Sequence, residues 1–120
     1  MQTVWIALAG AVGAAARYRI GVAVGVRSFP WATLAINVGG SFLLALLIVG
    51  PWSARWSPST TNTIGIGLLG AFTTFSTFGY EAFTLARTGR EQLAIVYVVL
   101  SIVGGVGAAA LGYLVGRALS

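Results

Sequence analysis

The sequence contains no cysteine, histidine, lysine or aspartate, and its only carboxylates are Glu81 and Glu91. Without cysteine the chain can form neither disulfides nor thiolate metal sites. Without histidine, and with only two carboxylates, it lacks the side chains on which most hydrolases and metalloenzymes depend. We therefore expect a protein that is not an enzyme.

Charge is scarce as well. Only 8% of the 120 residues are charged and 58% are hydrophobic, whereas about a quarter of the residues of a soluble domain are charged. The net charge of +5 comes from seven arginines scattered singly between apolar runs. This pattern is typical of interfacial anchors and topology signals and does not indicate nucleic-acid binding. The composition therefore predicts a multi-pass protein of the lipid bilayer.

Four apolar segments are each long enough to cross a bilayer, which takes about 20 residues. The connections between them are short and leave no room for an extramembrane domain. We therefore expect an all-α membrane protein, with residues 1–120 forming a single domain of four transmembrane helices. The expected helices cover about 4–26, 31–50, 63–85 and 93–115.

The arginines give only a weak orientation signal. The first and third loops, together with Arg17 and Arg19, carry five arginines against two, Arg55 and Arg117, at the opposite end. If Arg17 and Arg19 lie inside the fold, the ratio falls to three against two. Such a small bias lets a chain insert in both orientations.

The stretch from Gly70 to Phe78 is unusually polar for the middle of a spanning segment. Four of its nine residues carry hydroxyls, and Phe72, Phe75 and Phe78 recur every third residue. Glycine and hydroxyl side chains weaken a helix, so we expect the third helix to be broken near its middle. Irregular backbone there must be covered by protein or line a cavity, and its carbonyls could hold a small cation. The alternative is a continuous helix whose hydroxyls bond to the preceding turn.

Two further polar stripes accompany this stretch. Thr33, Asn37 and Ser41 follow one another at intervals of four in the second helix, and Tyr97 and Ser101 do so in the fourth. Each stripe alone could be hydrogen-bonded contact between helices. Together with the hydroxyl-rich stretch they favour a pathway. Its neutral donors and positive ring edges suit a small anion that accepts hydrogen bonds strongly.

Three blocks of the sequence also match a known pattern. They are GAVGAAARY at residues 10–18, PWATLAINVGGSF at 30–42 and GAFTTFSTF at 70–78. In order and separation they resemble the signature blocks of the CrcB/Fluc fluoride channel family, over essentially the whole chain. The TTFSTF sequence is the most specific of them.

The resemblance implies a passive fluoride-selective channel in the cell membrane, through which the cell loses toxic fluoride. It also implies that two subunits pair antiparallel as a dual-topology dimer with two pores and a central structural sodium ion. We expect a homodimer rather than a pair with a paralogue, because nothing in this chain requires a distinct partner.

The same resemblance implies roles for individual residues. Asn37 would be a pore-lining amide, Phe75 and Phe78 would turn their ring edges to fluoride, and the backbone carbonyls of Gly70 and Thr73 would hold the sodium.

Other positions extend the implied pathway. Tyr97 and Ser101 fall on the family's hydroxyl track, and Arg17 matches an arginine near the pore vestibule. Gly105 departs from the pattern, since a hydroxyl is expected there. Glu81 matches a family carboxylate to which we assign no role.

Two other classes of protein share some of these features. A small four-helix dual-topology multidrug exporter has a similar length, but such an exporter needs a carboxylate in its first helix, and this chain has none there. A structural four-helix subunit without transport activity would not need the polar stripes.

Overall fold

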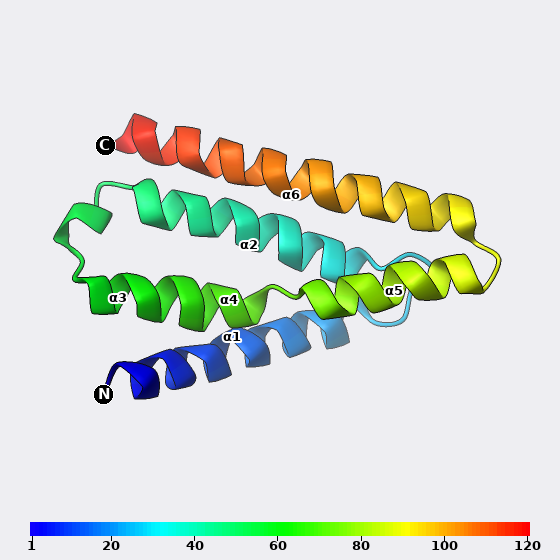
Figure 1. Ribbon diagram of the computed structural model, residues 1–120, viewed down its shortest axis with the longest axis horizontal. Helices are drawn as coiled ribbons and strands as arrows, with labels where there is room; N and C mark the ends of the chain where they lie inside the picture. The colour runs from blue at the N-terminus through cyan, green and yellow to red at the C-terminus, as the bar shows by residue number, and fades with distance from the viewer.

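The computed structural model covers residues 1–120 and contains helices and no strands. Three helices are uninterrupted: α1 (Gln2–Val24), α2 (Trp31–Val49) and α6 (Glu91–Leu119). They lie side by side with a fourth, segmented rod that runs between α2 and α1 (Figure 1). Both termini and the α2–α3 connection lie at one end of the molecule, and the α1–α2 and α5–α6 connections lie at the other.

The three uninterrupted helices are long and apolar enough to span a membrane. They were expected over 4–26, 31–50 and 93–115, so their observed ends differ from the expected ones by up to four residues. The largest differences are in α6, which continues to Leu119, and at the ends of α1.

The third expected helix is broken, as its sequence predicted. It comprises α3 (Pro58–Asn62), the π-helix η2 (Thr63–Leu69), the short α4 (Gly70–Phe72) and, after a gap, α5 (Phe75–Arg87). Thr73 and Thr74 have extended backbone and interrupt the helix. Because of this interruption, none of its pieces alone has the length of a spanning helix.

Local sequence signals explain where several elements begin and end. The Ser57 hydroxyl accepts a hydrogen bond from the Thr60 N–H at 3.1 Å and so caps α3, with Pro58 in the first turn. Gly25 and Gly89 follow α1 and α5 with φ angles of 73° and 80°, a region that glycine adopts without strain. The tight turns of the α1–α2 and α5–α6 connections therefore depend on these two glycines.

Glycine also lets helices approach backbone to backbone. A Cβ atom at Gly13 in α1 would overlap the carbonyl oxygen of Leu68 in η2, and one at Gly112 in α6 would overlap that of Phe42 in α2. Close approach through small residues is how helices associate in lipid, where burying apolar side chains gives little drive. The pairs α1–η2 and α2–α6 are both built in this way.

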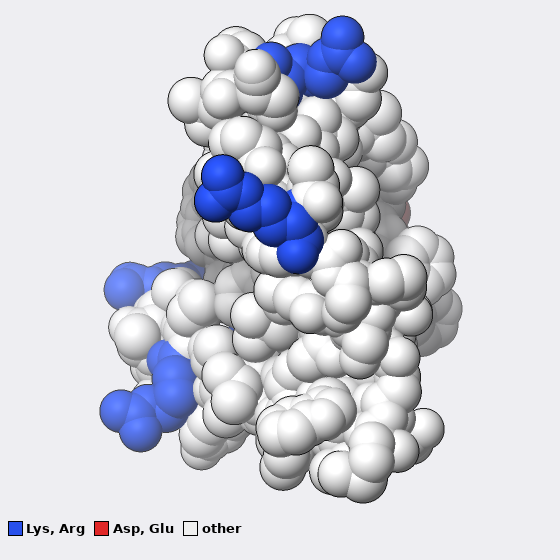
Figure 2. Space-filling view, turned by 90° about the vertical axis from the view of Figure 1, so that its left-hand side faces the viewer, with Lys and Arg blue, Asp and Glu red and all other residues white.

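A single copy buries little of its apolar surface. Only 13 of 120 residues are buried. A small core, near the α1–α2 and α5–α6 connections, consists of Phe29, Leu85, Ala94 and Tyr97. Separate basic side chains stand out on an otherwise largely uncharged surface when the molecule is viewed from the termini (Figure 2). Such a surface needs lipid or another protein around it.

The glycine contacts predict a difference between two otherwise equal substitutions in α6. Alanine normally stabilises a helix relative to glycine by about 0.5–1 kcal/mol. Gly112→Ala should nevertheless lower the melting temperature in detergent, because the new methyl group overlaps the Phe42 carbonyl. Gly107→Ala meets no atom within 4 Å and should not lower it. Equal melting temperatures for the two variants would contradict this packing.

Candidate functional site

The break between α4 and α5 is held by one side chain of α2. The Asn37 amide nitrogen donates to the Thr74 carbonyl at 2.9 Å, and the Thr74 N–H donates to Asn37 Oδ1 at 2.8 Å. In a continuous helix the Thr74 N–H would instead bond the Gly70 carbonyl. Asn37 thus satisfies both backbone groups of Thr74 that the break leaves without a helical partner. We call this pair of bonds the Asn37–Thr74 clamp.

The hydroxyls around the clamp behave in both of the ways that the sequence allowed. The Thr74 hydroxyl accepts from the Thr77 N–H at 3.2 Å and caps the start of α5. The Thr73 hydroxyl, in contrast, donates back to the Leu69 carbonyl at 3.2 Å. The first interaction supports the break, and the second is the bond to the preceding turn that a continuous helix would make.

One hollow at the break brings together most of the residues predicted to form the site. It has a volume of about 300 Å³ and lies between α2, the break and α6. We call it the phenylalanine hollow. No charged side chain lines it. Seven of the ten predicted residues do: Asn37, Ser41, Gly70, Thr73, Phe75, Phe78 and Ser101.

The phenylalanine hollow offers neutral donors and aromatic rings. The rings of Phe75 and Phe78 lie 5.7 Å apart between centroids, with their planes at 56°. The Ser101 hydroxyl is buried without a partner, and the Asn37 amide has a second N–H beyond the one used in the clamp. The Ser41 hydroxyl donates to the Asn37 carbonyl at 2.7 Å. The Ser101 hydroxyl, the second Asn37 N–H and the two rings could bind a small anion without any fixed positive charge.

Arg17 and Thr33 lie in a different hollow. This second space has a volume of about 580 Å³, lies along α1 and the start of α2, and is also lined by Thr77. We call it the Arg17 hollow. Thr74 lines both hollows, so the clamp stands between them. Nine of the ten predicted residues are therefore divided between two spaces on either side of the break.

Tyr97 lines neither hollow. Its ring is completely buried, packed edge-on against Phe29 at 5.4 Å and Phe78 at 5.2 Å between centroids. Its hydroxyl donates to Glu81 Oε1 at 3.3 Å. Tyr97 and Ser101 share a face of α6, as their spacing predicts, but they face different surroundings.

Sequence reasoning missed two partners in this region. It assigned Asn37 to a pathway without identifying Thr74 as the group that it binds, and it gave Glu81 no role. A carboxylate inside an apolar segment must find a hydrogen-bond donor. That rule, had it been applied to Glu81, would have indicated a partner without identifying Tyr97 among the available hydroxyls.

The break also has the chemistry expected of a sodium site. The Thr74 N–H donates to Asn37 in the clamp and not to the Gly70 carbonyl. The Gly70 carbonyl therefore lacks the donor that a continuous helix would supply. Carbonyls of unwound backbone are hard oxygen ligands that suit sodium. No cluster of three or more histidine, cysteine or carboxylate side chains is present to hold another kind of metal. The Gly70 carbonyl thus fits the group, and the extended backbone of Thr73 lies in the same break.

Comparison with known proteins gives consistent matches. A family described as "CrcB-like protein, Camphor Resistance (CrcB)" matches residues 4–113. The chain is similar to the "Fluoride-specific ion channel FluC" of Magnetococcus marinus, with 43% identity covering 98% of both chains. It is also similar to "Fluoride-specific ion channel FluC 1" of Desulfitobacterium hafniense, with 46% identity over 88% of this chain and 94% of the relative. A third relative, the "Fluoride-specific ion channel FluC" of Deinococcus radiodurans, has 43% identity over 96% of this chain and 94% of the relative.

The clamp predicts that Asn37 is needed for stability as well as for any role toward a ligand. Asn37→Ala leaves the N–H and the carbonyl of Thr74 without their partner, at a cost of roughly 2 kcal/mol or more. We expect a melting temperature in detergent several degrees below that of the unmodified protein. Ser41→Ala, one turn further along α2, removes only a bond within the helix and serves as the control. An equal loss in both variants would show that the clamp does not stabilise the break.

Proposed function

The chain belongs to the CrcB-like family of fluoride-specific ion channels, and from this premise we propose that it is a passive, fluoride-selective channel of the cell membrane. The family consists of ion channels and not of enzymes, in agreement with the side chains that the sequence lacks. A passive channel would let the cell lose fluoride that accumulates in the cytoplasm.

The observation that carries this proposal is the uncharged lining of the phenylalanine hollow. A permeating anion must bind to the channel strongly enough to enter it and weakly enough to leave it. The Asn37 amide, the Ser101 hydroxyl and two phenylalanine rings that turn their edges to the ion would supply attraction without a fixed positive charge. Fluoride is the smallest halide and the strongest hydrogen-bond acceptor among them, so neutral donors favour it over chloride.

The other residues predicted for the pathway extend this site in two directions. Arg17 and Thr33 line the adjoining hollow and would draw anions towards the break from that side. Tyr97 would continue the path beyond Phe78, against which its ring packs. Ser41 contributes to the same wall as Asn37, one turn further along α2.

The channel requires a second copy of the chain, which we propose lies antiparallel to the first. Irregular backbone inside a membrane needs protein around it, and in one copy Gly70 beside the break is exposed. Phe75 is 83% exposed, although its aromatic ring lines the hollow. The weak arginine bias allows both orientations. Two copies would place two phenylalanine hollows, and hence two pores, in one homodimer.

A sodium ion would sit where the two breaks meet. The carbonyls of Gly70 and Thr73 from both copies would hold it, and the ion would supply positive charge that holds the carbonyl dipoles of the two breaks together. Its role would be structural, because it binds backbone at the contact between the copies and not the side chains of either hollow.

Purified protein in liposomes tests the transport function. We expect rapid fluoride efflux and a chloride efflux at least about a hundredfold slower, a difference of about 2.7 kcal/mol in barrier height. Phe75→Ile should lower fluoride efflux at least about tenfold, because a branched alkyl group has no positive ring edge. Phe83→Ile, on the same helix but outside the hollow, is the matched control. Equal rates for the two anions in the unmodified protein would contradict fluoride selectivity.

Two measurements test the antiparallel pair and its sodium. A tag at the N-terminus should be accessible from both sides of cell-derived vesicles, since each dimer presents one copy in each orientation. Replacing sodium by a bulky organic cation should lower the melting temperature of the purified dimer, because the carbonyls at the break lose their ligand. Labelling from one side only would contradict the antiparallel homodimer. A melting temperature independent of sodium would contradict the structural sodium ion.

A further inference from the structure

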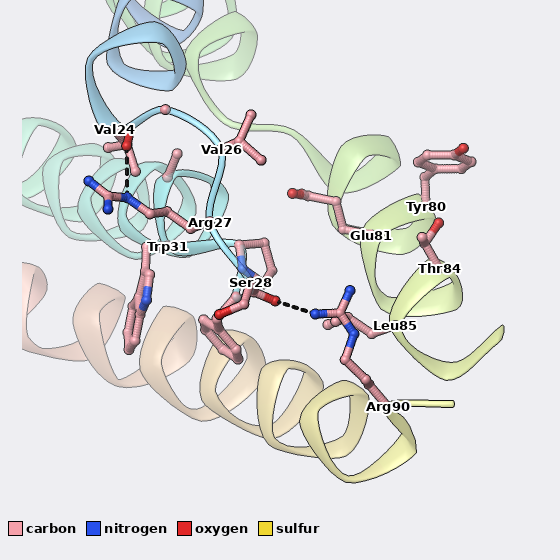
Figure 3. Close-up of a pocket in the computed structure, with 14 residues that line it drawn as sticks. Val24, Val26, Arg27, Ser28, Trp31, Tyr80, Glu81, Thr84, Leu85 and Arg90 are labelled. Atoms are coloured by element: carbon pink, nitrogen blue, oxygen red, sulfur yellow. Dashed lines mark hydrogen bonds between the residues drawn. The ribbon is translucent and has the colours of Figure 1, made fainter. Parts of the chain in front are cut away.

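A third hollow lies at the end of the molecule opposite the termini. It has a volume of about 310 Å³ and is bounded by the α1–α2 loop, the start of α2, and α5 (Figure 3). Arg90 reaches into it from just before α6, and its guanidinium donates to the Ser28 carbonyl at 3.0 Å. Arg27, also lining the hollow, donates from Nε to the Val24 carbonyl at 3.0 Å. We call this space the Arg90 hollow.

A chain of contacts connects the phenylalanine hollow with the Arg90 hollow. The Phe78 ring lines the former and packs against the buried ring of Tyr97. The Tyr97 hydroxyl bonds Glu81, and Glu81 lines the Arg90 hollow, where its carboxylate projects from α5 towards the α1–α2 loop (Figure 3). On a path that followed these residues, a small anion would leave the protein beside the Glu81 carboxylate.

A lone carboxylate at that point would repel anions, and the two guanidinium groups offset it. With Arg27, Arg90 and Glu81 as its only charged residues, the lining of the hollow carries a net charge of +1. Each guanidinium has five N–H groups, of which each residue uses one for its loop carbonyl. The remaining N–H groups can bind an anion, and the bond to Ser28 keeps the Arg90 guanidinium at the edge of the opening.

We propose that the Arg90 hollow is an anion-collecting mouth of the permeation path, in which Arg90, assisted by Arg27, counteracts the repulsion by Glu81. The inference rests on the proposed channel function and adds an anion-binding site outside the blocks of sequence that indicated the channel. The mouth raises the local concentration of small anions, whereas discrimination among them takes place in the phenylalanine hollow. Its contribution is electrostatic and therefore depends on ionic strength.

Fluoride efflux from liposomes at two ionic strengths tests the proposal. Arg27→Gln combined with Arg90→Gln should lower the initial rate about three- to tenfold at low ionic strength. The difference should vanish in about 1 M of a salt whose anion does not permeate, where the Debye length is about 3 Å. Arg90→Gln alone should also lower the rate, whereas Arg90→Lys keeps the charge and should retain most of it. Arg87→Gln is the control, because Arg87 lies at the end of α5 before the same loop and outside the hollow.

The outcomes separate this proposal from the channel function itself. Absence of fluoride efflux in the unmodified protein would contradict the channel. Normal efflux in the unmodified protein together with unchanged efflux in the double variant would contradict the proposed anion-collecting role of the Arg90 hollow. An equal loss of rate in Arg87→Gln would contradict it too, because it would indicate that loss of an arginine changes membrane insertion. If Arg90→Lys lost as much as Arg90→Gln, the contact with Ser28 rather than the charge would matter, and the proposal would fall. These two single variants also decide the matter if the double variant does not assemble.

Discussion

The structure depends on the two hydrogen bonds between Asn37 and Thr74. A chain that leaves its helix inside a membrane has backbone groups with no water to bind, and each unsatisfied group there is costly. One amide side chain meets both groups of Thr74, because it presents a donor and an acceptor on the same face. No hydroxyl side chain could do this with the same geometry. The break persists because α2 supplies this amide.

Close packing brings α2 and α1 into contact with the segment that contains the break. Gly40, which follows Asn37 by about one turn, is buried, and a Cβ atom there would overlap the methyl group of Thr73. On the other side, a Cβ at Gly13 of α1 would overlap the Leu68 carbonyl just before the break. The irregular backbone is thus held between two helices that approach it through glycine. Side chains of ordinary size at either position would push these helices away and open the clamp.

The sequence predicted the elements of the fold better than their contacts. Apolar runs located the helices, and the hydroxyl-rich stretch located the break, because both follow from local composition. Spacing by four placed Tyr97 and Ser101 on one face of a helix, but it does not say which element faces each residue. Phe29, Phe78 and Glu81 surround the first, whereas the second faces the phenylalanine hollow. No local signal indicated the π-helix η2, which packs against α1.

The π-helix has a consequence for the angular position of everything that follows it. Each residue of an α-helix turns the chain by about 100°, and a π-turn contains about one residue more than an α-turn. The seven residues of η2 therefore set the direction in which Gly70, Thr73 and Thr74 emerge towards α2. Loss of one residue from this segment would rotate the break away from Asn37 even if every residue of the site remained. The length of this stretch, which consists mostly of glycine, isoleucine and leucine, is thus constrained by the site that follows it.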